Sequence, residues 1–493
     1  MNKRLRGILL GSILLAGCVY EKTDPSLEKI PEGKAKSDIE IFSAILENAH
    51  PSLNLYISDK RFIFLVDSIE KSIDEPVTER ELFNKINYII NEIGCSHTVT
   101  SLPAYIYDSL QNRSYFFPYP VKWIDDQLLV NAVESNLPQG TVIKSINGEP
   151  VKKILQSLCL YNTVDGFHRK MQQNLAAEDF SLEYFFRYGA KETFELEIED
   201  TFGIVKKHYD NAINLAEWNN RNDGFKYYYD RTKVDYDLTM DPKRGFAYLR
   251  LATFDFEGTE REDAYINFCF NSFELLKHKK DIRSLIIDLR ENPGGKLYNG
   301  FLLYSFLANK PFKEYEKVFS RIKKIPYTTY LDTDFANEDV PGIHEKLGTD
   351  FSDKKSNDFF SLQDSLIESW QPDGLRFNGD VYIITNSKVV STASYFALLV
   401  KNSGRGKIIG EETMGGNNSG NGYSALKYVL PNSKIRFEFP YAHIIYNFKE
   451  LSNTGHGLIP DYNMPDNYES FKKNTDRQLR FIIDTLILNN KSH

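Results

Sequence analysis

The sequence predicts a multidomain α/β protein with a helical N-terminal region, a β-rich middle and a larger α/β core. Three patterns support this. Apolar residues recur at helical spacing early in the chain, short strand-like segments follow, and strands alternate with helices beyond residue 236. The last pattern indicates a largely parallel sheet, and 493 residues suffice for about three domains. The predicted units are a helical domain (37–105), a β-rich domain (115–205), the core (236–475) and a closing helix (476–493).

Composition narrows the functional classes. The formal net charge is −8, and phosphate binding needs a basic surface, so we expect no nucleic-acid partner. Apart from Cys18, the cysteines are Cys95, Cys159 and Cys269, an odd set without metal-ligand spacing. We expect them to be buried structural residues, with thiol chemistry as the alternative for Cys95 because it lies beside His97. We expect no metal and no cofactor.

The N-terminus contains a targeting signal. Basic residues precede an apolar run from Ile8 to Ala16, which is too short to span a bilayer and ends in Leu15-Ala16-Gly17-Cys18. This motif resembles the lipobox of bacterial lipoproteins. The resemblance implies a signal peptide (1–17), lipidation of Cys18, a polar tether (18–36) and a membrane-anchored lipoprotein of the cell envelope, periplasmic or in the outer membrane. An ordinary secretory signal is the alternative.

A histidine follows the second predicted helix. Apolar residues from Leu82 to Ile93 repeat at helical spacing, and Gly94 is a natural residue for a helix C-terminus. Ser96-His97 comes next, so we expect His97 on a loop just past the helix end.

The middle region contains one recognisable motif. Gly140-Thr-Val-Ile-Lys-Ser-Ile-Asn147-Gly148 follows a predicted hairpin (123–132), and its Asn-Gly pair marks a tight turn. The segment resembles the Gly-Asp-x-Ile-x-x-Ile-Asn-Gly part of PDZ domains. That resemblance implies a PDZ-like domain with a helix over 152–160.

Two strand–turn–helix segments indicate the chemistry. The predicted strand 285–289 leads to Gly294-Gly295, and the predicted strand 381–385 leads to Ser391 at the start of a helix. Glycines let a backbone approach a ligand closely, and a helix N-terminus stabilises negative charge. A serine nucleophile here would have backbone N–H groups to stabilise its oxyanion. The two segments therefore indicate acyl transfer.

With these motifs together, the chain resembles the S41 serine peptidases, the tail-specific and carboxyl-terminal processing proteases. The segment Asp288-Leu-Arg290-Glu-Asn292-Pro-Gly294-Gly295 is similar to the family signature Asp-Leu-Arg-x-Asn-x-Gly-Gly. Residues 404–413 are similar to its Gly-Arg-x-x-x-x-Gly-Glu-x-Thr segment, and 457–461 to its closing Gly-x-x-Pro-Asp motif. A gapless match places the nucleophile on Ser391. The resemblance implies an α/β protease core of the ClpP/crotonase-like type.

The resemblance also implies a histidine base. Bacterial tail-specific members use a lysine, but the gapless match places that lysine on Gly416, and the next one, Lys427, is expected on another strand. The subfamily of the tricorn core protease instead uses a histidine preceded by serine, as in Ser96-His97, and a late glutamate, for which Glu450 is our candidate. His456 is the alternative base.

In the expected mechanism, His97 takes the proton of Ser391, and Glu450 or a nearby acceptor orients the imidazole. Histidine suits this role because its unperturbed pKa is about 6.5. Ser391 could instead only cap a helix, and His97 could be an ordinary loop histidine.

The expected oxyanion donors are the backbone N–H groups of Gly294 or Gly295 and of Thr392. The glycines could alternatively serve only a tight turn. The acidic residue usual three places after the nucleophile is replaced by Ser394, and we expect Asp288 and Arg290 to form a buried structural pair.

The expected function is cleavage of peptides or protein C-terminal segments by a serine endopeptidase, with the PDZ-like domain gripping the substrate through strand addition. One alternative is a catalytically inactive S41-like scaffold that binds peptides or hydrophobic ligands. A second is an esterase or amidase acting on small molecules. The sequence leaves the oligomeric state open.

Overall fold

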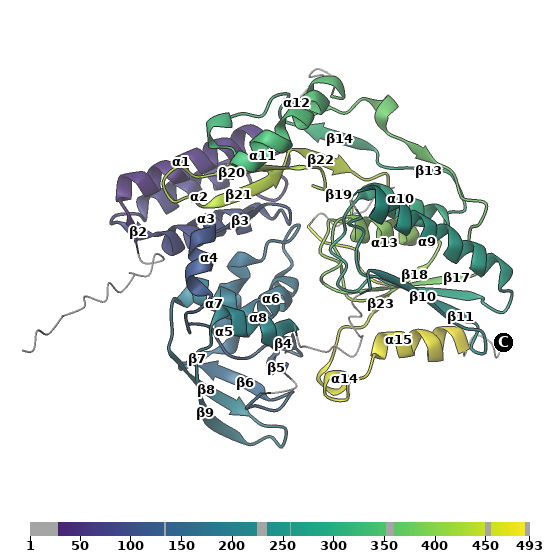
Figure 1. Ribbon diagram of the computed structural model, residues 1–493, viewed down its shortest axis with the longest axis horizontal. Coiled ribbons are helices and arrows are strands. Elements are labelled where there is room, and N and C mark those ends of the chain that lie inside the picture. The colour runs from purple at the N-terminus through teal and green to yellow at the C-terminus, as the bar shows by residue number, and fades with distance from the viewer. Residues whose placement is uncertain are drawn as a thin grey trace, which may run out of the picture.

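The computed structural model describes residues 28–132, 135–223, 234–256, 258–351, 359–448 and 455–488. Cys18, Glu450 and the predicted signal peptide lie outside these residues. The described chain folds into several units of mixed helices and sheets (Figure 1), which confirms the multidomain α/β class. No helix in these ranges is long and apolar enough to cross a bilayer.

The N-terminal helices pack through their apolar faces. They are α1 (Glu32–Ala49), α2 (Asp59–Lys71) and α3 (Glu79–Ile93). The strand β1 (Lys29–Ile30) pairs with β2 (Val77–Thr78). Residues 28–36, which we predicted as part of the tether (18–36), belong instead to the helical domain, because Ile30 and Ala35 are buried in its core. A capping box between Thr78 and Glu81 starts α3, and Gly94 with a φ of 68° ends it.

The β-rich domain is a twisted antiparallel sheet covered by helices. The sheet order is β4-β5-β6-β8-β9, with β7 attached to β6, and the predicted hairpin is confirmed by pairing of Trp123 with Leu128. The strands are β4 (Val121–Ile124), β5 (Gln127–Val130), β6 (Val142–Ile146), β7 (Glu149–Pro150), β8 (Thr193–Glu199) and β9 (Val205–Asn211). The helices are α4 (Ala104–Leu110), which leads into the domain, α5 (Val151–Leu158), α6 (Arg169–Glu178), α7 (Phe180–Tyr188) and α8 (Leu215–Asp223).

The core is built on a second sheet of order β10-β11-β12-β17-β18-β23, in which all pairs except β10–β11 are parallel. Leu285, Ile287 and Ile383 pack on one face, beneath the helices, whereas Ile286 and Ile384 face the C-terminal helix (Figure 1). The strands are β10 (Tyr236–Asp241), β11 (Phe246–Leu251), β12 (Ser284–Asp288), β17 (Asp380–Thr385), β18 (Lys407–Gly410) and β23 (Tyr462–Asn463). The helices are α9 (Thr259–His278), α10 (Leu297–Ser305), α13 (Thr392–Asn402), α14 (Tyr468–Lys472) and α15 (Arg477–Phe481), which continues as a π-helix (Ile482–Leu488).

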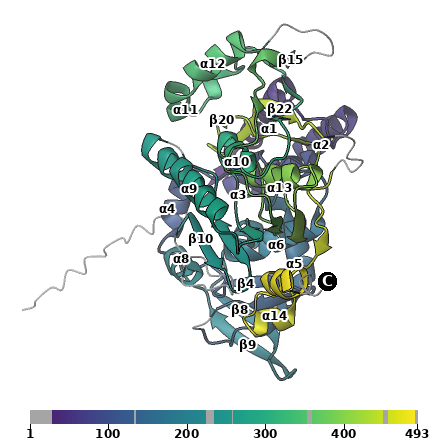
Figure 2. The same cartoon turned by 90° about the vertical axis from the view of Figure 1, so that its right-hand side faces the viewer.

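The segment between α10 and β17, which showed little periodicity in sequence, forms its own small elements at one end of the molecule (Figure 2). It contributes to a sheet of order β15-β14-β22-β19 and to a short pair, β13–β16. The elements of the segment are β13 (Phe312–Lys313), β14 (Lys317–Ser320), α11 (Thr333–Glu338), α12 (Val340–Thr349), β15 (Phe360–Ser361) and β16 (Ser369–Trp370). The strands β19 (Ser419–Gly420) and β22 (Ala442–Ile445) come from later in the chain and complete the sheet.

One further sheet joins the N-terminal helices to the core. The strand β3 (Val99–Ser101), just after His97, pairs antiparallel with β21 (Arg436–Pro440), which pairs with β20 (Ala425–Val429). Two segments more than three hundred residues apart in the chain are thus hydrogen-bonded side by side. This pairing fixes the His97 loop relative to the core.

Candidate active site

Ser391 occupies a strained turn between β17 and α13. Its backbone has φ 54° and ψ −129°, a conformation that residues other than glycine rarely adopt. Its side chain accepts no capping hydrogen bond from the helix. Ser391 therefore stands at the N-cap position of α13, at a strand-to-helix turn, without capping the helix through its hydroxyl. Sharp strand-to-helix turns present the nucleophilic serine in α/β-hydrolases.

The Gly294-Gly295 turn lies directly against Ser391. A Cβ atom at Gly294 would sit 2.7 Å from Ser391 Cβ and 3.0 Å from the Thr392 nitrogen. The φ angles of 92° at Gly294 and 134° at Gly295 also favour glycine. The two turns meet because β12 and β17 are parallel neighbours, so their carboxyl ends lie at the same edge of the sheet.

The backbone donors in this turn are not equivalent. The Gly294 N–H donates to Asn292 Oδ1 at 2.9 Å. The N–H groups of Gly295 and Thr392, by contrast, donate to no other described residue. The geometry therefore favours Gly295, rather than Gly294, as the donor that acts together with Thr392.

His97 lies on the loop after α3, as predicted. Its Nδ1 is 3.1 Å from Ser96 Oγ, so the preceding serine contacts the imidazole. Among the described residues no hydrogen bond joins His97 to Ser391. Catalytic hydrogen bonds are often long without substrate. Glu450 lies outside the described residues, so the third predicted member of the site is not placed.

A buried carboxylate ties the His97 loop to the Ser391 side of the site. Asp165 Oδ1 accepts the Ser96 N–H at 2.8 Å, and its Oδ2 accepts the Gly416 N–H at 3.2 Å. The neighbouring Gly415 is close to the nucleophile, since a Cβ there would lie 3.5 Å from the Ser391 nitrogen. Asp165 therefore positions both halves of the site. It precedes α6 in the β-rich domain, where no sequence motif marked it.

A second buried network supports the same loop. Asn421 Nδ2 donates to Cys95 Sγ at 3.2 Å, and Asn421 Oδ1 faces Ser52 Oγ at 2.9 Å and His443 Nδ1 at 2.7 Å. The adjacent Gly422 lies beside the nucleophile, because a Cβ there would be 3.7 Å from Ser391 Oγ.

The three cysteines of the described residues, Cys95, Cys159 and Cys269, are buried and free, as predicted. Burial, and to a lesser extent the nearby Asp165, raises the pKa of Cys95 to about 12. A thiol with that pKa is protonated at neutral pH, so Cys95 is a poor nucleophile.

Residues 245–464 match Peptidase family S41. This part of the chain is thus similar to an S41 peptidase domain. Among solved structures, the chain is similar to mature CPAF, with 13% identity over 94% of this chain and 99% of that chain and a TM-score of 0.62. A CPAF mutant gives 13% identity, coverage of 94% and 98%, and a TM-score of 0.69. Mature CPAF complexed with lactacystin shows 14% identity over 93% of this chain and 99% of that chain, with a TM-score of 0.63. No curated protein sequence matches. The domain and these folds support a serine peptidase hydrolase.

Position 416, where the motif match predicts the lysine of a Ser–Lys dyad, has no room for a side chain. A Cβ at Gly416 would lie 2.5 Å from the Ser419 carbonyl oxygen. The next lysine downstream, Lys427, is exposed on β20, with its ammonium 6.0 Å from the centre of the Phe335 ring. Lys427 thus contacts the Phe335 ring and forms no hydrogen bond with Ser391 among the described residues.

Lys388, three residues before Ser391, is a lysine that the motif comparison did not mark. It forms ion pairs with Glu178 at the end of α6 and with Glu291, the latter at 2.8 Å. Burial, and less strongly Lys122, lowers the pKa of Lys388 to about 7. The two carboxylates contact the ammonium directly and favour its charged form. Lys388 is therefore an ion-paired cation that joins two domains, not a free base.

The remaining signature residues of the S41 domain are structural. Arg290 Nη2 contacts Asp288 Oδ2 at 2.5 Å and Asp476 Oδ2 at 2.7 Å, and both Arg290 and Asp288 are buried. This confirms the predicted buried pair. Ser394, at the position of the missing acid, bonds Thr413 Oγ1 at 2.7 Å.

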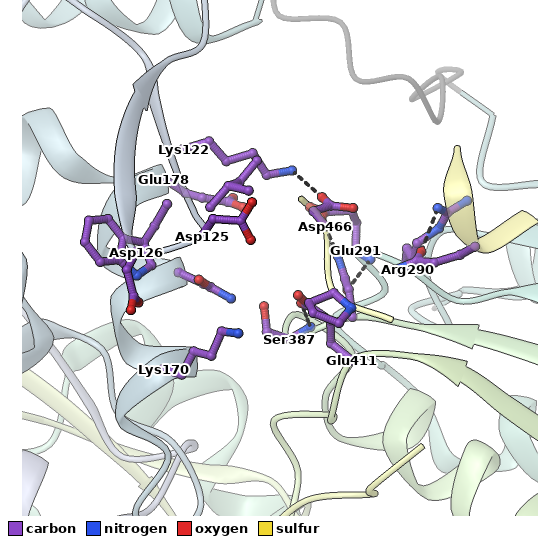
Figure 3. Close-up of a pocket in the computed structure, with 16 residues that line it drawn as sticks. Lys122, Asp125, Asp126, Lys170, Glu178, Arg290, Glu291, Ser387, Glu411 and Asp466 are labelled. Atoms are coloured by element: carbon purple, nitrogen blue, oxygen red, sulfur yellow. Dashed lines mark hydrogen bonds and ion pairs between the residues drawn. The ribbon is translucent and has the colours of Figure 1, made fainter. Parts of the chain in front are cut away.

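A charged pocket separates the S41 domain from the β-rich domain near this edge of the sheet (Figure 3). Lys122 of β4 and Lys170 of α6 line one side, and Ser387 and Glu411 line the other. Lys122 also bridges the gap through an ion pair of 3.3 Å with Asp466. Its lining includes Asn386 and Ser387, which lie in the segment between β17 and Ser391.

Proposed function

We propose that this protein is a serine endopeptidase in which Ser391 is the nucleophile and His97 is the general base. The observation that carries this proposal is the turn at Ser391. A hydroxyl without a structural hydrogen bond is held in a strained backbone, next to two uncommitted N–H groups at Gly295 and Thr392. Strain at such a position persists where the surrounding structure over-determines it, and it often marks a functional site.

In the proposed reaction, Ser391 Oγ attacks the scissile carbonyl carbon while His97 accepts the hydroxyl proton. The carbonyl oxygen becomes an oxyanion that the N–H groups of Gly295 and Thr392 stabilise. His97 then donates the proton to the leaving amine, and water hydrolyses the acyl-enzyme by the reverse sequence. Ser96 contacts the imidazole and Asp165 holds its loop. We retain Glu450 as the candidate for orienting His97.

The substrate we propose is an extended peptide or a protein C-terminal segment. The strand β4 is at the edge of its sheet, since it pairs only with β5 among the described residues. Three of its residues, Lys122, Trp123 and Ile124, line the pocket that also contains Ser387. A peptide added as a strand to this PDZ-like domain would have main-chain partners beside the catalytic edge.

Labelling with a fluorophosphonate probe tests the chemistry. Wild-type protein should label, and Ser391→Ala should abolish labelling. His97→Ala should reduce it strongly, because the serine then lacks its base. Two matched controls should label like wild type: Ser394→Ala, which removes another hydroxyl of the same helix, and His278→Ala, which removes an exposed histidine on α9. Absence of labelling in the wild type would instead favour the inactive binding scaffold.

We also propose that the protein is a lipoprotein of the cell envelope, anchored through Cys18. The support is the sequence Leu15-Ala16-Gly17-Cys18 after a short apolar run. Expression in a bacterium with a radiolabelled fatty acid should label the wild type and leave Cys18→Ser unlabelled. Incorporation of the label into Cys18→Ser would contradict the assignment.

A further inference from the structure

Three side chains that the proposed mechanism does not use converge near the junction of the β-rich domain and the core. They are His168, just before α6, Glu412, after β18, and His456, before β23. One nitrogen or oxygen atom of each lies within 4.8 Å of those of the other two. The three residues are far apart in sequence, so only the tertiary fold brings them together.

The contacts among them are close. His168 Nε2 lies 2.6 Å from Glu412 Oε1, and His456 Nδ1 lies 3.3 Å from the same oxygen. The two imidazole rings are 4.5 Å apart and nearly perpendicular. Although it is so close to Glu412, the buried His168 Nε2 has no hydrogen-bond partner of acceptable geometry. Glu412 Oε1 thus faces a ring nitrogen of both histidines: it forms a hydrogen bond with His456 Nδ1, whereas His168 Nε2 has none. Two imidazole nitrogens that converge on one carboxylate oxygen are arranged like ligands around a shared centre.

Backbone contacts hold the segments that carry these side chains. The Gly457 N–H donates to Glu412 Oε1 at 2.8 Å. The Asn417 N–H donates to the His456 carbonyl at 3.0 Å, and the Phe167 N–H donates to the Gly455 carbonyl at 3.3 Å. The cluster is thus preorganised from both domains, which reduces the ordering cost of binding an ion.

We propose that His168, Glu412 and His456 bind a divalent transition-metal ion of the Zn²⁺ class. Zn²⁺ takes imidazole nitrogens at ~2.0–2.1 Å and carboxylate oxygens at ~2.0–2.2 Å, so tetrahedral ligands stand about 3.3 Å apart. The 3.3 Å between His456 Nδ1 and Glu412 Oε1 matches that value, whereas the 2.6 Å between His168 Nε2 and Glu412 Oε1 would have to widen when the ion binds. Two imidazoles exclude Ca²⁺ and Mg²⁺ as the favoured ions, because these prefer oxygen ligands.

The site is open on one side. The His456 side chain is 50% exposed, compared with 15% for His168 and 22% for Glu412. Water can therefore complete the coordination. The bound ion would cross-link α6 of the β-rich domain to the core. It would also steady the loop containing Thr413, whose hydroxyl bonds Ser394 one helical turn after the nucleophile.

Metal titration of the untagged full-length chain in detergent, after dialysis against a chelator, tests the proposal. Calorimetry should show one equivalent of Zn²⁺ bound, and Co²⁺ should give the visible absorption of a low-coordinate histidine site. His456→Ala and Glu412→Gln should each weaken binding by more than about tenfold. Zn²⁺ should raise the thermal midpoint of the wild type more than that of either variant, because an ion that binds the folded state stabilises it.

The controls separate this site from background binding and from catalysis. His278→Ala removes an exposed histidine elsewhere and should bind Zn²⁺ like the wild type. Ser391→Ala should also bind normally, so the result does not depend on the proposed peptidase activity. Far-UV circular dichroism checks the fold of each variant, and Glu412→Gln provides the test if His456→Ala misfolds. Absence of one-equivalent binding in the wild type, or wild-type affinity in both ligand variants, would overturn the proposal.

Discussion

Replacing Ser391 with glycine should remove the nucleophile and relieve the backbone at the same time. The φ of 54° and ψ of −129° lie in a region that glycine adopts readily and other residues do not. Alanine at the same position removes the hydroxyl but keeps the strain. The difference in stability between the Ser391→Gly and Ser391→Ala variants therefore isolates the strain stored at this turn.

The magnitude follows from three contributions. A residue in such a sparsely populated conformation costs about 1–3 kcal/mol. Glycine loses more backbone entropy on folding than alanine, which offsets roughly 0.5–1 kcal/mol of the gain. The Ser391 side chain makes no capping hydrogen bond, so neither variant loses one. We expect Ser391→Gly to be more stable than Ser391→Ala by about 1 kcal/mol, with an upper bound near 2.5 kcal/mol.

Differential scanning calorimetry of both variants provides the measurement, with the midpoint of the core transition as the readout. A difference of about 1 kcal/mol corresponds to about 2–4 °C for a domain of this size. The matched control is Ser394, in the regular part of the same helix. There Ser394→Gly should be less stable than Ser394→Ala, by roughly 0.5–1 kcal/mol. If glycine is also the less stable residue at position 391, the turn is not strained and the main support for the nucleophile is lost.

Three further predictions address the surroundings of this turn. Asp165→Asn removes one of the two charge-assisted hydrogen-bond acceptors of Asp165. It should therefore lower the free energy of unfolding by about 1.5–3 kcal/mol and slow fluorophosphonate labelling. Labelling at the wild-type rate would show that Asp165 does not position the site. Gly294→Ala should displace Ser391 and reduce labelling, whereas Gly203→Ala, where φ is also positive but nothing lies within 4 Å, should leave labelling unchanged. Burial lowers the pKa of His50 to about 3 and that of His443 to about 4, both below the 6.5 of an exposed histidine. Their contribution to stability is therefore fully present above pH 6.5 and is lost as the pH falls toward 4, because only the unfolded chain takes up these protons. Denaturation curves at pH 7.5 and 5.5 should show that the free energy of unfolding falls by about 1.4 kcal/mol per pH unit below pH 6.5 for each of the two histidines. If His443→Gln leaves this fall unchanged, the account is contradicted.

Local sequence patterns predicted the framework of the site because they report on nearby residues. The buried apolar run of β12, the glycine pair after it and the serine after β17 are all readable within about ten residues. Sequence patterns did not predict the roles of Asp165 and Lys388, because both residues act through contacts with distant segments. A carboxylate that accepts N–H groups from two distant loops, or a lysine paired across domains, has no local pattern that distinguishes it from a surface residue.

The oxyanion donors show the same division. The sequence predicted that either Gly294 or Gly295 donates a backbone N–H to the oxyanion and did not distinguish between them. The tertiary structure favours Gly295, because the Asn292 side chain already accepts the Gly294 N–H. The sequence predicted that the helical domain starts at residue 37, but α1 begins at Glu32. The first turn of α1 is polar in sequence except for Ala35, which is buried in the core.

The sequence by itself determined the α/β class, the turn that carries Ser391 and the absence of a lysine at position 416, because these depend on periodicity and on residue type at fixed spacing. Only the tertiary structure decided how His97 is held relative to Ser391. The pairing of β3 with β21 and the bridge through Asp165 are contacts between distant segments. The meeting of His168, Glu412 and His456 is decided in the same way. Their energies come from packing and hydrogen bonds across domains, which no local stretch of sequence encodes.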